Sequence, residues 1–215
     1  MFRKFNAIIF DFDGVVIDSE TIHEKAKRAT LEHFKLVYKE KIFDDFKGKT
    51  DNDFFSYIVG HAEEKANFTE LSEYKKKKYA ELFSEVTLVT GFSDFISFCK
   101  ESGIRTALTT SATKRDLELA INKFNLQNDF TVIITGEDTS KHKPDPEPYI
   151  KTLQVLKINP DAALVIEDSP NGIISSKKAG CYTVGIINSF PRNALEDAGA
   201  DTIVQTFHEI MDLLV

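Results

Sequence analysis

Short apolar segments alternate with helical segments from residue 91 onward, and this alternation restricts the fold more than any other feature of the sequence. The apolar segments are rich in β-branched residues, and amphipathic segments of about ten residues separate most of them. Such alternation indicates βαβ units, and therefore a parallel sheet with helices on both faces. The expected strands are 104–109, 130–135, 163–166, 182–187 and 202–204.

A further apolar run, Ala7–Phe10, lies far upstream of these strands. The segment that follows it, residues 17–88, has apolar residues at helical spacing and no strand-like alternation. We therefore expect an α/β core with a doubly wound, Rossmann-like parallel sheet, formed by residues 1–16 and 89–215. Residues 17–88 are expected to form an all-helical cap domain inserted after the first strand.

The first apolar run ends in two aspartates, Asp11 and Asp13, which Gly14 follows. Side chains on an extended strand alternate between faces, so both carboxylates are expected to point the same way while Phe12 faces the core. Glycine then permits a sharp turn or a close approach to a ligand. An Asp-x-Asp at a strand end is also common turn chemistry, and the pair alone does not separate these two interpretations.

Polar residues of particular types follow the later strands as well. Thr110 and Ser111 offer hydroxyls and backbone N–H groups suited to a phosphate oxygen. Lys143 adds an ammonium after the third strand, and Glu167 with Asp168 adds carboxylates after the fourth. Because the carboxyl ends of parallel strands lie at one edge of a sheet, we expect these groups to meet the aspartate pair there.

This set of side chains suits Mg²⁺-assisted phosphoryl transfer. Carboxylate oxygens from Asp11 and Asp168 are the kind of ligand that Mg²⁺ prefers. The metal and Lys143 would offset the repulsion between an anionic nucleophile and a phosphate ester. One aspartate can attack phosphorus to form an aspartyl-phosphate, while the other protonates the leaving oxygen and later activates water.

The chain resembles, over essentially its full length, the haloacid dehalogenase superfamily phosphatases that carry a helical cap after strand one. Within that superfamily it is similar to the subgroup of β-phosphoglucomutase and phosphoglycolate phosphatase. The resemblance implies an Mg²⁺-dependent phosphoric monoester hydrolase. Its markers are the stretch from Asp11 to Ser19 (DFDGVVIDS), Thr110-Ser111, Lys143-Pro144 and the stretch from Glu167 to Gly172 (EDSPNG).

The resemblance also implies roles for individual residues. Asp11 would be the nucleophile and Asp13 the general acid and base. Thr110, Ser111 and Lys143 would bind the phosphate.

The implied Mg²⁺ site uses the same edge of the sheet. Its ligands would be Asp11, the main-chain carbonyl of Asp13, and Asp168, with Glu167 in the outer shell.

Two parts of the cap are implied to bind substrate. His23 matches the position of a histidine that helps the acid/base aspartate in the mutase, and Lys47 to Thr50 matches a cap loop that faces the active site. The mutase places an arginine there to grip a second phosphate, whereas this chain has Asp51, with Lys49 as an imperfect substitute. We therefore expect a phosphatase acting on a small phosphorylated metabolite, with a phosphomutase of the β-phosphoglucomutase type as the alternative.

Two other classes of protein use similar residues. A phospho-accepting receiver domain also has an aspartate, a hydroxyl, a lysine and Mg²⁺, but the second aspartate, Asp13, and the helical cap favour an enzyme. A catalytically silent binding module is disfavoured because the full set of reactive side chains is present.

The composition disfavours some classes of binding partner. The net charge of −7 disfavours nucleic acid and anionic membranes, which demand a basic surface. No apolar stretch approaches about 18 residues, and Cys99 and Cys181 lack metal-ligand spacing and suit a reducing compartment. We expect a cytoplasmic protein with no obligatory protein partner.

The lysine run 75–78 is expected to be a solvated helix face.

Overall fold

The computed structural model describes residues 5–47, 49–62 and 66–214, and the chain separates into two compact units. The first unit combines the segment up to Asp18 with the segment from Thr87 onward, and the second is Ser19–Val86. The expected helical segment, 17–88, is too long by two residues at each end. The two extra residues at each end form β2 (Ile17–Asp18) and β3 (Thr87–Leu88), which pair antiparallel. The chain therefore leaves and re-enters the first unit through a short two-stranded ladder.

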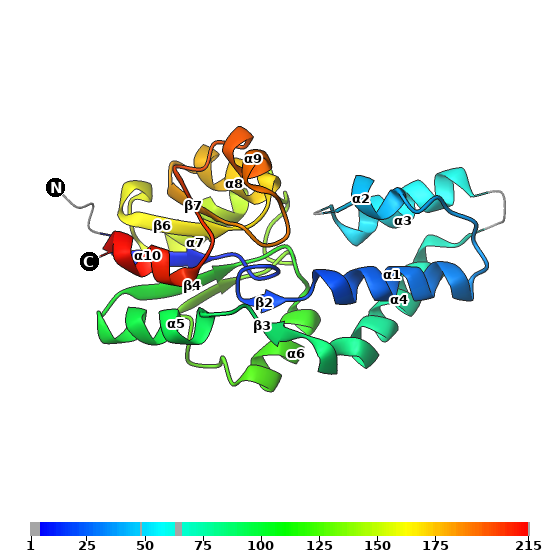
Figure 1. Cartoon of the computed structure of the whole chain (residues 1–215), viewed down its shortest axis with the longest axis horizontal. Coiled ribbons are helices and arrows are strands. Elements are labelled where there is room, and N and C mark those ends of the chain that lie inside the picture. The colour runs from blue at the N-terminus through cyan, green and yellow to red at the C-terminus, as the bar shows by residue number, and fades with distance from the viewer. Residues whose placement is uncertain (1–4, 48, 63–65, 215) are drawn as a thin grey trace. The chain divides into compact units, whose positions relative to one another are not determined.

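The first unit, labelled in Figure 1 from β4 to β7, is built on a parallel sheet. The sheet has six strands in the order β5-β4-β1-β6-β7-β8. The predicted doubly wound α/β core is therefore confirmed. β1 lies near the centre, with β4 on one side and β6 on the other, so the carboxyl ends of these three strands are neighbours. The strands are β1 (Ala7–Phe10), β4 (Arg105–Thr109), β5 (Val132–Ile134), β6 (Ala163–Glu167), β7 (Tyr182–Ile186) and β8 (Thr202–Val204).

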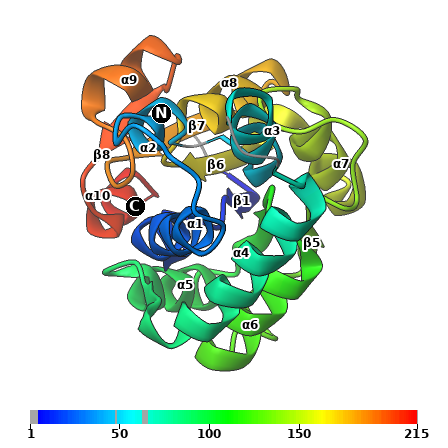
Figure 2. The ribbon, with the colours of Figure 1, turned by 90° about the vertical axis from the view of Figure 1, so that its right-hand side faces the viewer.

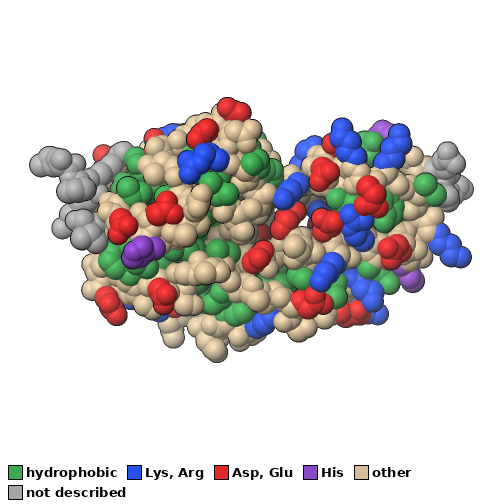
Figure 3. All heavy atoms as spheres, viewed as in Figure 1, with side chains coloured by type: hydrophobic (Ala, Val, Ile, Leu, Met, Phe, Trp, Pro, Cys, Tyr) green, Lys and Arg blue, Asp and Glu red, His purple; other side chains and the backbone are tan. Residues whose placement is uncertain are grey.

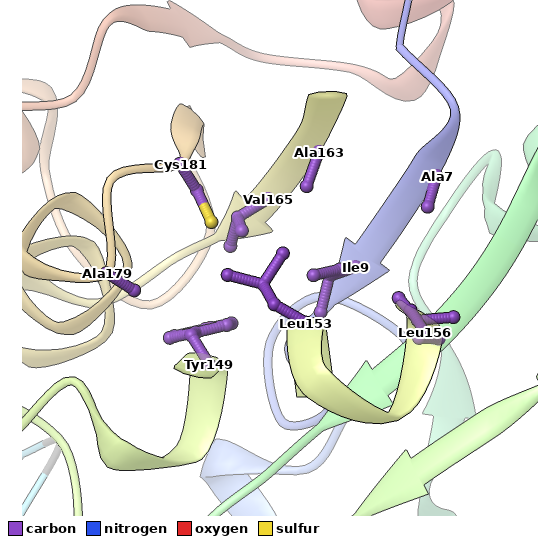
Figure 4. Packing of buried hydrophobic residues seen from close by; sticks show 10 residues of the cluster. Ala7, Ile9, Tyr149, Leu153, Leu156, Ala163, Val165, Ala179 and Cys181 are labelled. Atoms are coloured by element: carbon purple, nitrogen blue, oxygen red, sulfur yellow. The ribbon is translucent and has the colours of Figure 1, made fainter. Parts of the chain in front are cut away.

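Helices cover both faces of this sheet because successive residues of each buried strand point to opposite sides. On one face Ile9 packs in an apolar cluster with Tyr149 and Leu153 of α7 (Glu147–Leu156), as Figure 4 shows. On the other face the ring of Phe10 contacts two phenylalanine rings of α5 (Phe92–Glu101) edge to face. The other helices of this unit are α6 (Lys114–Phe124), η2 (Pro160–Ala162), α8 (Pro170–Lys178), α9 (Arg192–Asp197) and α10 (Phe207–Leu214).

The described residues of the second unit form helices joined by turns and loops, with no strand among them. α1 and α4 lie side by side (Figures 1 and 2), and α3 begins with a capping box in which Thr50 and Asp53 exchange hydrogen bonds. Its apolar cluster includes the fully buried side chains of Leu31, Phe54 and Leu71. The elements are α1 (Glu20–His33), α2 (Ile42–Asp45), α3 (Asp51–His61), α4 (Phe68–Leu82) and η1 (Phe83–Glu85).

The lysine run 75–78 is solvated only in part. Basic and acidic side chains are interspersed over the visible surface of the helical unit (Figure 3), and the side chain of Lys77 is 71% exposed. Lys75, in contrast, is 3% exposed and forms an ion pair with Asp51, 2.5 Å away. The prediction fails at Lys75 because consecutive residues of a helix point in different directions, so one of four lysines faces the interior of this unit.

Two expectations from composition can be compared with the structure. Cys99 and Cys181 are buried and form no disulfide, as expected of small core residues. In the part of the chain that the structure describes, no helix combines the length and the apolar character needed to cross a bilayer.

Candidate active site

Asp11 follows β1 directly and is 8% exposed, and its backbone N–H donates to the carbonyl of Ile166 at 3.0 Å. The strand ends at Phe10, so the strict alternation expected for the aspartate pair does not extend to Asp13. Instead the chain turns at Gly14, which has a φ of +81°, and Asp13 is half-buried. Burial and the charge of Glu167 raise the pKa of Asp11, and the charge of Asp13 makes a smaller contribution in the same direction.

Lys143 joins the neighbouring strand ends. Its ammonium Nζ lies 2.5 Å from Oδ1 of Asp11, 2.6 Å from Oε1 of Glu167 and 3.0 Å from the carbonyl oxygen of Thr109. The side chain is 7% exposed, and its peptide bond to Pro144 is cis. The structure thus brings together the lysine and two of the carboxylates that the sequence places after three different strands.

Glu167 is fully buried and receives hydrogen bonds on both carboxylate oxygens. Besides Lys143, Oε1 accepts from the hydroxyl of Tyr149 at 2.5 Å, and Oε2 accepts from the hydroxyl of Ser169 at 3.0 Å. Gly172 leaves the space for this carboxylate, since a Cβ atom built there would lie 1.8 Å from Oε1. A buried carboxylate with this many donors has a fixed position.

Asp168 is also buried and lies against the turn that follows Asp11. The backbone N–H of Ser189 donates to its Oδ2 at 3.3 Å. A Cβ on Gly14 would lie 1.8 Å from the same oxygen, so only glycine leaves room for this carboxylate. The side chain of Asn188 donates to the Gly14 carbonyl at 2.9 Å and holds the turn in place.

Thr110 and Ser111 follow β4 at the same edge of the sheet. Thr110 is buried, and its hydroxyl accepts a hydrogen bond from the Ala112 N–H at 2.9 Å. Because that hydroxyl acts as an acceptor there, its hydrogen is left to donate to an oxygen such as that of a phosphate. Ser111 is exposed.

The buried charges change one another's proton affinity. Burial, together with the charge of Glu167, raises the pKa of Asp11 to about 7, although Lys143 acts in the opposite direction. Burial and the charges of Asp11 and Glu167 raise the pKa of Asp168 well above its ordinary range. Burial would lower the pKa of Lys143, but Asp11 and Glu167 outweigh this effect, so the lysine remains protonated.

These residues fit a divalent cation. Asp11, Glu167 and Asp168 are all buried, and each offers a carboxylate oxygen within 4.8 Å of the others. Together they bring three acidic groups to a site where Lys143 is the basic partner, which leaves an excess of buried negative charge when all are ionised. A hard cation with oxygen ligands compensates such an excess.

The raised pKa of Asp11 predicts how stability depends on pH. Between its unfolded value near 4 and about 7, the folded state binds more protons than the unfolded state, so without metal this group lowers the free energy of unfolding as pH rises. We expect the melting temperature to be higher in MgCl₂ than in EDTA, and we expect this difference to be larger at about pH 8 than at about pH 6. The reason is that the cation binds the deprotonated carboxylate. Thermal denaturation at both pH values measures the difference, and an equal shift would contradict the assignment.

The expected substrate residues of the cap lie in the helical unit. The ring of His23 stacks on Tyr79 at 4.2 Å between centroids, and its Nδ1 lies 2.8 Å from Nζ of Lys75. Lys75 and Lys27 contact Asp51 at 2.5 and 3.6 Å. Burial acts to raise the pKa of Asp51, but the charges of these lysines and of His23 hold it below its ordinary value.

Lys49, the other expected substrate residue, is exposed, and its Nζ lies 4.5 Å from the centre of the Phe46 ring. Gly48, in the same expected loop, is outside the described residues.

Three residues of the site were not expected from the sequence. Asn188 and Ser189 follow β7, and the rule that polar residues gather at the carboxyl ends of the strands would have found them. Tyr149 could not be found in this way, because it belongs to the apolar stripe of α7 and only its hydroxyl reaches the site.

Comparison with known proteins identifies the family of the chain. A model of the haloacid dehalogenase-like hydrolases matches residues 8–186. The chain belongs to this family. It is 31% identical to the phosphorylated carbohydrates phosphatase of Thermotoga maritima over 97% of both chains. It is 29% identical to the β-phosphoglucomutase of Bacillus subtilis, over 97% of this chain and 93% of that protein.

Solved structures of related proteins have the same fold. The crystal structure of CbbY from Rhodobacter sphaeroides in complex with phosphate superposes with a TM-score of 0.85, at 25% identity and 96% coverage of both chains. A mutant of that CbbY was solved in complex with xylulose-(1,5)bisphosphate. This chain is therefore an enzyme of the haloacid dehalogenase hydrolases, and it is a phosphatase or a phosphomutase of that family.

Proposed function

We propose that this enzyme hydrolyses a small phosphorylated metabolite, such as a sugar phosphate, through an aspartyl-phosphate on Asp11. The observation that carries the proposal is the buried pair of Asp11 and Lys143, with 2.5 Å between Oδ1 and Nζ, at the carboxyl edge of the sheet. A carboxylate held beside an ammonium is oriented for attack, and the ammonium can neutralise an approaching phosphate. The phosphatases among its relatives support a phosphate ester as the substrate.

The reaction would take two steps. In the first, an oxygen of Asp11 attacks phosphorus, the bond from phosphorus to the ester oxygen breaks, and that oxygen takes a proton from Asp13. In the second, Asp13 takes a proton from water, the water oxygen attacks phosphorus, the bond from phosphorus to the Asp11 oxygen breaks, and inorganic phosphate leaves with the Asp11 carboxylate restored. Lys143, Thr110 and Ser111 would hold the non-reacting phosphate oxygens.

Mg²⁺ would be held by Asp11, the main-chain carbonyl of Asp13, and Asp168. Glu167 would lie behind these ligands, because its oxygens already accept from Lys143, Tyr149 and Ser169. When bound, the ion supplies positive charge against the negative phosphate oxygens.

The charges of the cap favour hydrolysis over mutase activity. Transfer of a phosphoryl group back to a sugar phosphate needs a cation for the second phosphate, and Asp51 places a carboxylate where the mutase has arginine. Lys75 and Lys27 are already engaged with Asp51. We propose His23 and Lys49 as the residues of the cap that contact the substrate.

The intermediate gives a direct test. Asp13→Asn should still allow attack on p-nitrophenyl phosphate, whose leaving group needs no acid, but should slow hydrolysis of the aspartyl-phosphate by about 10²–10⁴-fold because the general base is lost. Intact-protein mass spectrometry after rapid quenching is expected to show one added phosphoryl group. The double variant Asp11→Asn/Asp13→Asn is the control and should show none; turnover of Asp13→Asn at the wild-type rate would contradict the role.

A panel of phosphorylated metabolites identifies the substrate. It should include β-glucose 1-phosphate with its bisphosphate activator, because release of inorganic phosphate indicates hydrolysis and formation of the isomeric sugar phosphate indicates the mutase.

A further inference from the structure

All the hydrogens of the Lys143 ammonium are already engaged. An ammonium has three N–H donors and no acceptor. In this site they face Asp11, Glu167 and the Thr109 carbonyl, at 2.5, 2.6 and 3.0 Å. To bind a substrate phosphate oxygen, Lys143 must therefore release one of these acceptors.

Glu167 is the acceptor best supplied with other donors. Its Oε1, which Lys143 contacts, also accepts from the Tyr149 hydroxyl at 2.5 Å, and its Oε2 accepts from the hydroxyl and N–H of Ser169 at 3.0 and 3.4 Å. A buried carboxylate that loses its last donor is strongly destabilised, whereas one that keeps several can part from a lysine.

We propose that Tyr149 is a positioning residue, whose hydroxyl holds Oε1 of Glu167 while Lys143 turns to the substrate phosphate. The inference rests on the proposed role of Lys143 in binding that phosphate. Tyr149 is fully buried and packs beside Leu153 and Ala179 beneath the sheet (Figure 4), so its hydroxyl is held in place by the core. Its ring centre lies 4.9 Å from Nζ of Lys143, so one side chain contacts both partners of the ion pair.

Tyr149→Phe isolates the hydroxyl, because the ring, its packing and its contact with the ammonium are retained. We expect the affinity for inorganic phosphate, measured by calorimetry with Mg²⁺ present, to fall about tenfold, as does kcat/KM for p-nitrophenyl phosphate. A purely structural role would lower the melting temperature and leave the phosphate affinity unchanged.

Tyr182→Phe is the matched control. Its hydroxyl is hydrogen-bonded to Thr202 Oγ1 at 2.6 Å, at the amino ends of β7 and β8. This variant also loses one tyrosine hydrogen bond, but we expect its phosphate affinity to match the wild type. Equal losses in both variants, or wild-type phosphate affinity in Tyr149→Phe, would overturn the proposal.

A double-mutant cycle tests whether the hydroxyl acts through Glu167. In a Glu167→Gln background the carboxylate charge that retains Lys143 is gone, so adding Tyr149→Phe should change phosphate affinity by less than about twofold. A full tenfold loss in that background would show that the hydroxyl acts elsewhere. Because the cycle measures phosphate binding, its result does not depend on the proposed reaction. If Asp11→Asn retained turnover, the proposed reaction would be wrong, but the phosphate affinities would still decide the role of Tyr149.

Discussion

Asp11→Asn is expected to lower kcat for a phosphate monoester by about 10⁴-fold or more, because an amide oxygen cannot form the acyl-phosphate that a carboxylate forms. Asparagine has nearly the same size and still accepts a hydrogen bond from Lys143, so the fold should be retained. The measurement is release of p-nitrophenol in the presence of Mg²⁺, with the melting temperature of each variant as a check on folding.

The charge of Asp11 gives this variant a second signature. Ionised Asp11 is costly in the metal-free protein, since burial and Glu167 raise its pKa to about 7. At about pH 8 without metal, Asp11→Asn should therefore melt no lower than the wild type, and MgCl₂ should stabilise it less.

The control for Asp11→Asn is the same substitution at Asp94, which is exposed in the first turn of α5. Asp94→Asn should keep wild-type activity. Retained turnover in Asp11→Asn would exclude Asp11 as the nucleophile.

The second large effect is expected at Gly172, which contributes no functional group. A Cβ there would lie 1.8 Å from Oε1 and 1.9 Å from Cδ of Glu167. Glu167 is fully buried and accepts hydrogen bonds on both carboxylate oxygens, so the clash with this Cβ can be relieved only if the carboxylate or the start of α8 moves. We expect Gly172→Ala to lower the free energy of unfolding by about 1–3 kcal/mol and kcat by about 10²-fold.

Gly60→Ala is the matched control for that substitution. Gly60 lies within α3, and among the described residues no atom beyond its chain neighbours and the backbone of its own helix comes within 4 Å of the position that its Cβ would occupy. Alanine there should raise the free energy of unfolding by about 0.5–1 kcal/mol, since alanine favours the helix more than glycine does. Urea denaturation and p-nitrophenyl phosphate kinetics compare the two variants, and wild-type activity in Gly172→Ala would show that the site does not depend on the position of Glu167.

The gathering of Asp11, Lys143 and Asp168 could be predicted because it follows from one topological rule. In a parallel sheet the carboxyl ends of all strands lie at one edge, so the loops that leave those ends, including the longer one from β5 to Lys143, meet there whatever their separation in sequence. The same rule placed Thr110 and Ser111, and applied to β7 it also reaches Asn188 and Ser189.

Side-chain partners could not be predicted in the same way. Tyr149 and Lys75 each belong to a helix whose periodicity gives only the face on which a residue lies. Tyr149 is on the apolar face, yet its hydroxyl bonds Glu167; Lys75 is in a run of charges, yet it is buried against Asp51.

The sequence by itself determined the parallel α/β core, the helical insertion and the edge at which the reactive side chains gather, because these depend on local patterns and on the order of elements. Only the tertiary structure decided that Lys143 is shared among Asp11, Glu167 and Thr109, and that Gly14 and Gly172 leave room for two buried carboxylates. Such contacts are made or lost when the separation between elements far apart in the chain changes by a few tenths of an ångström, and no local sequence pattern specifies that separation.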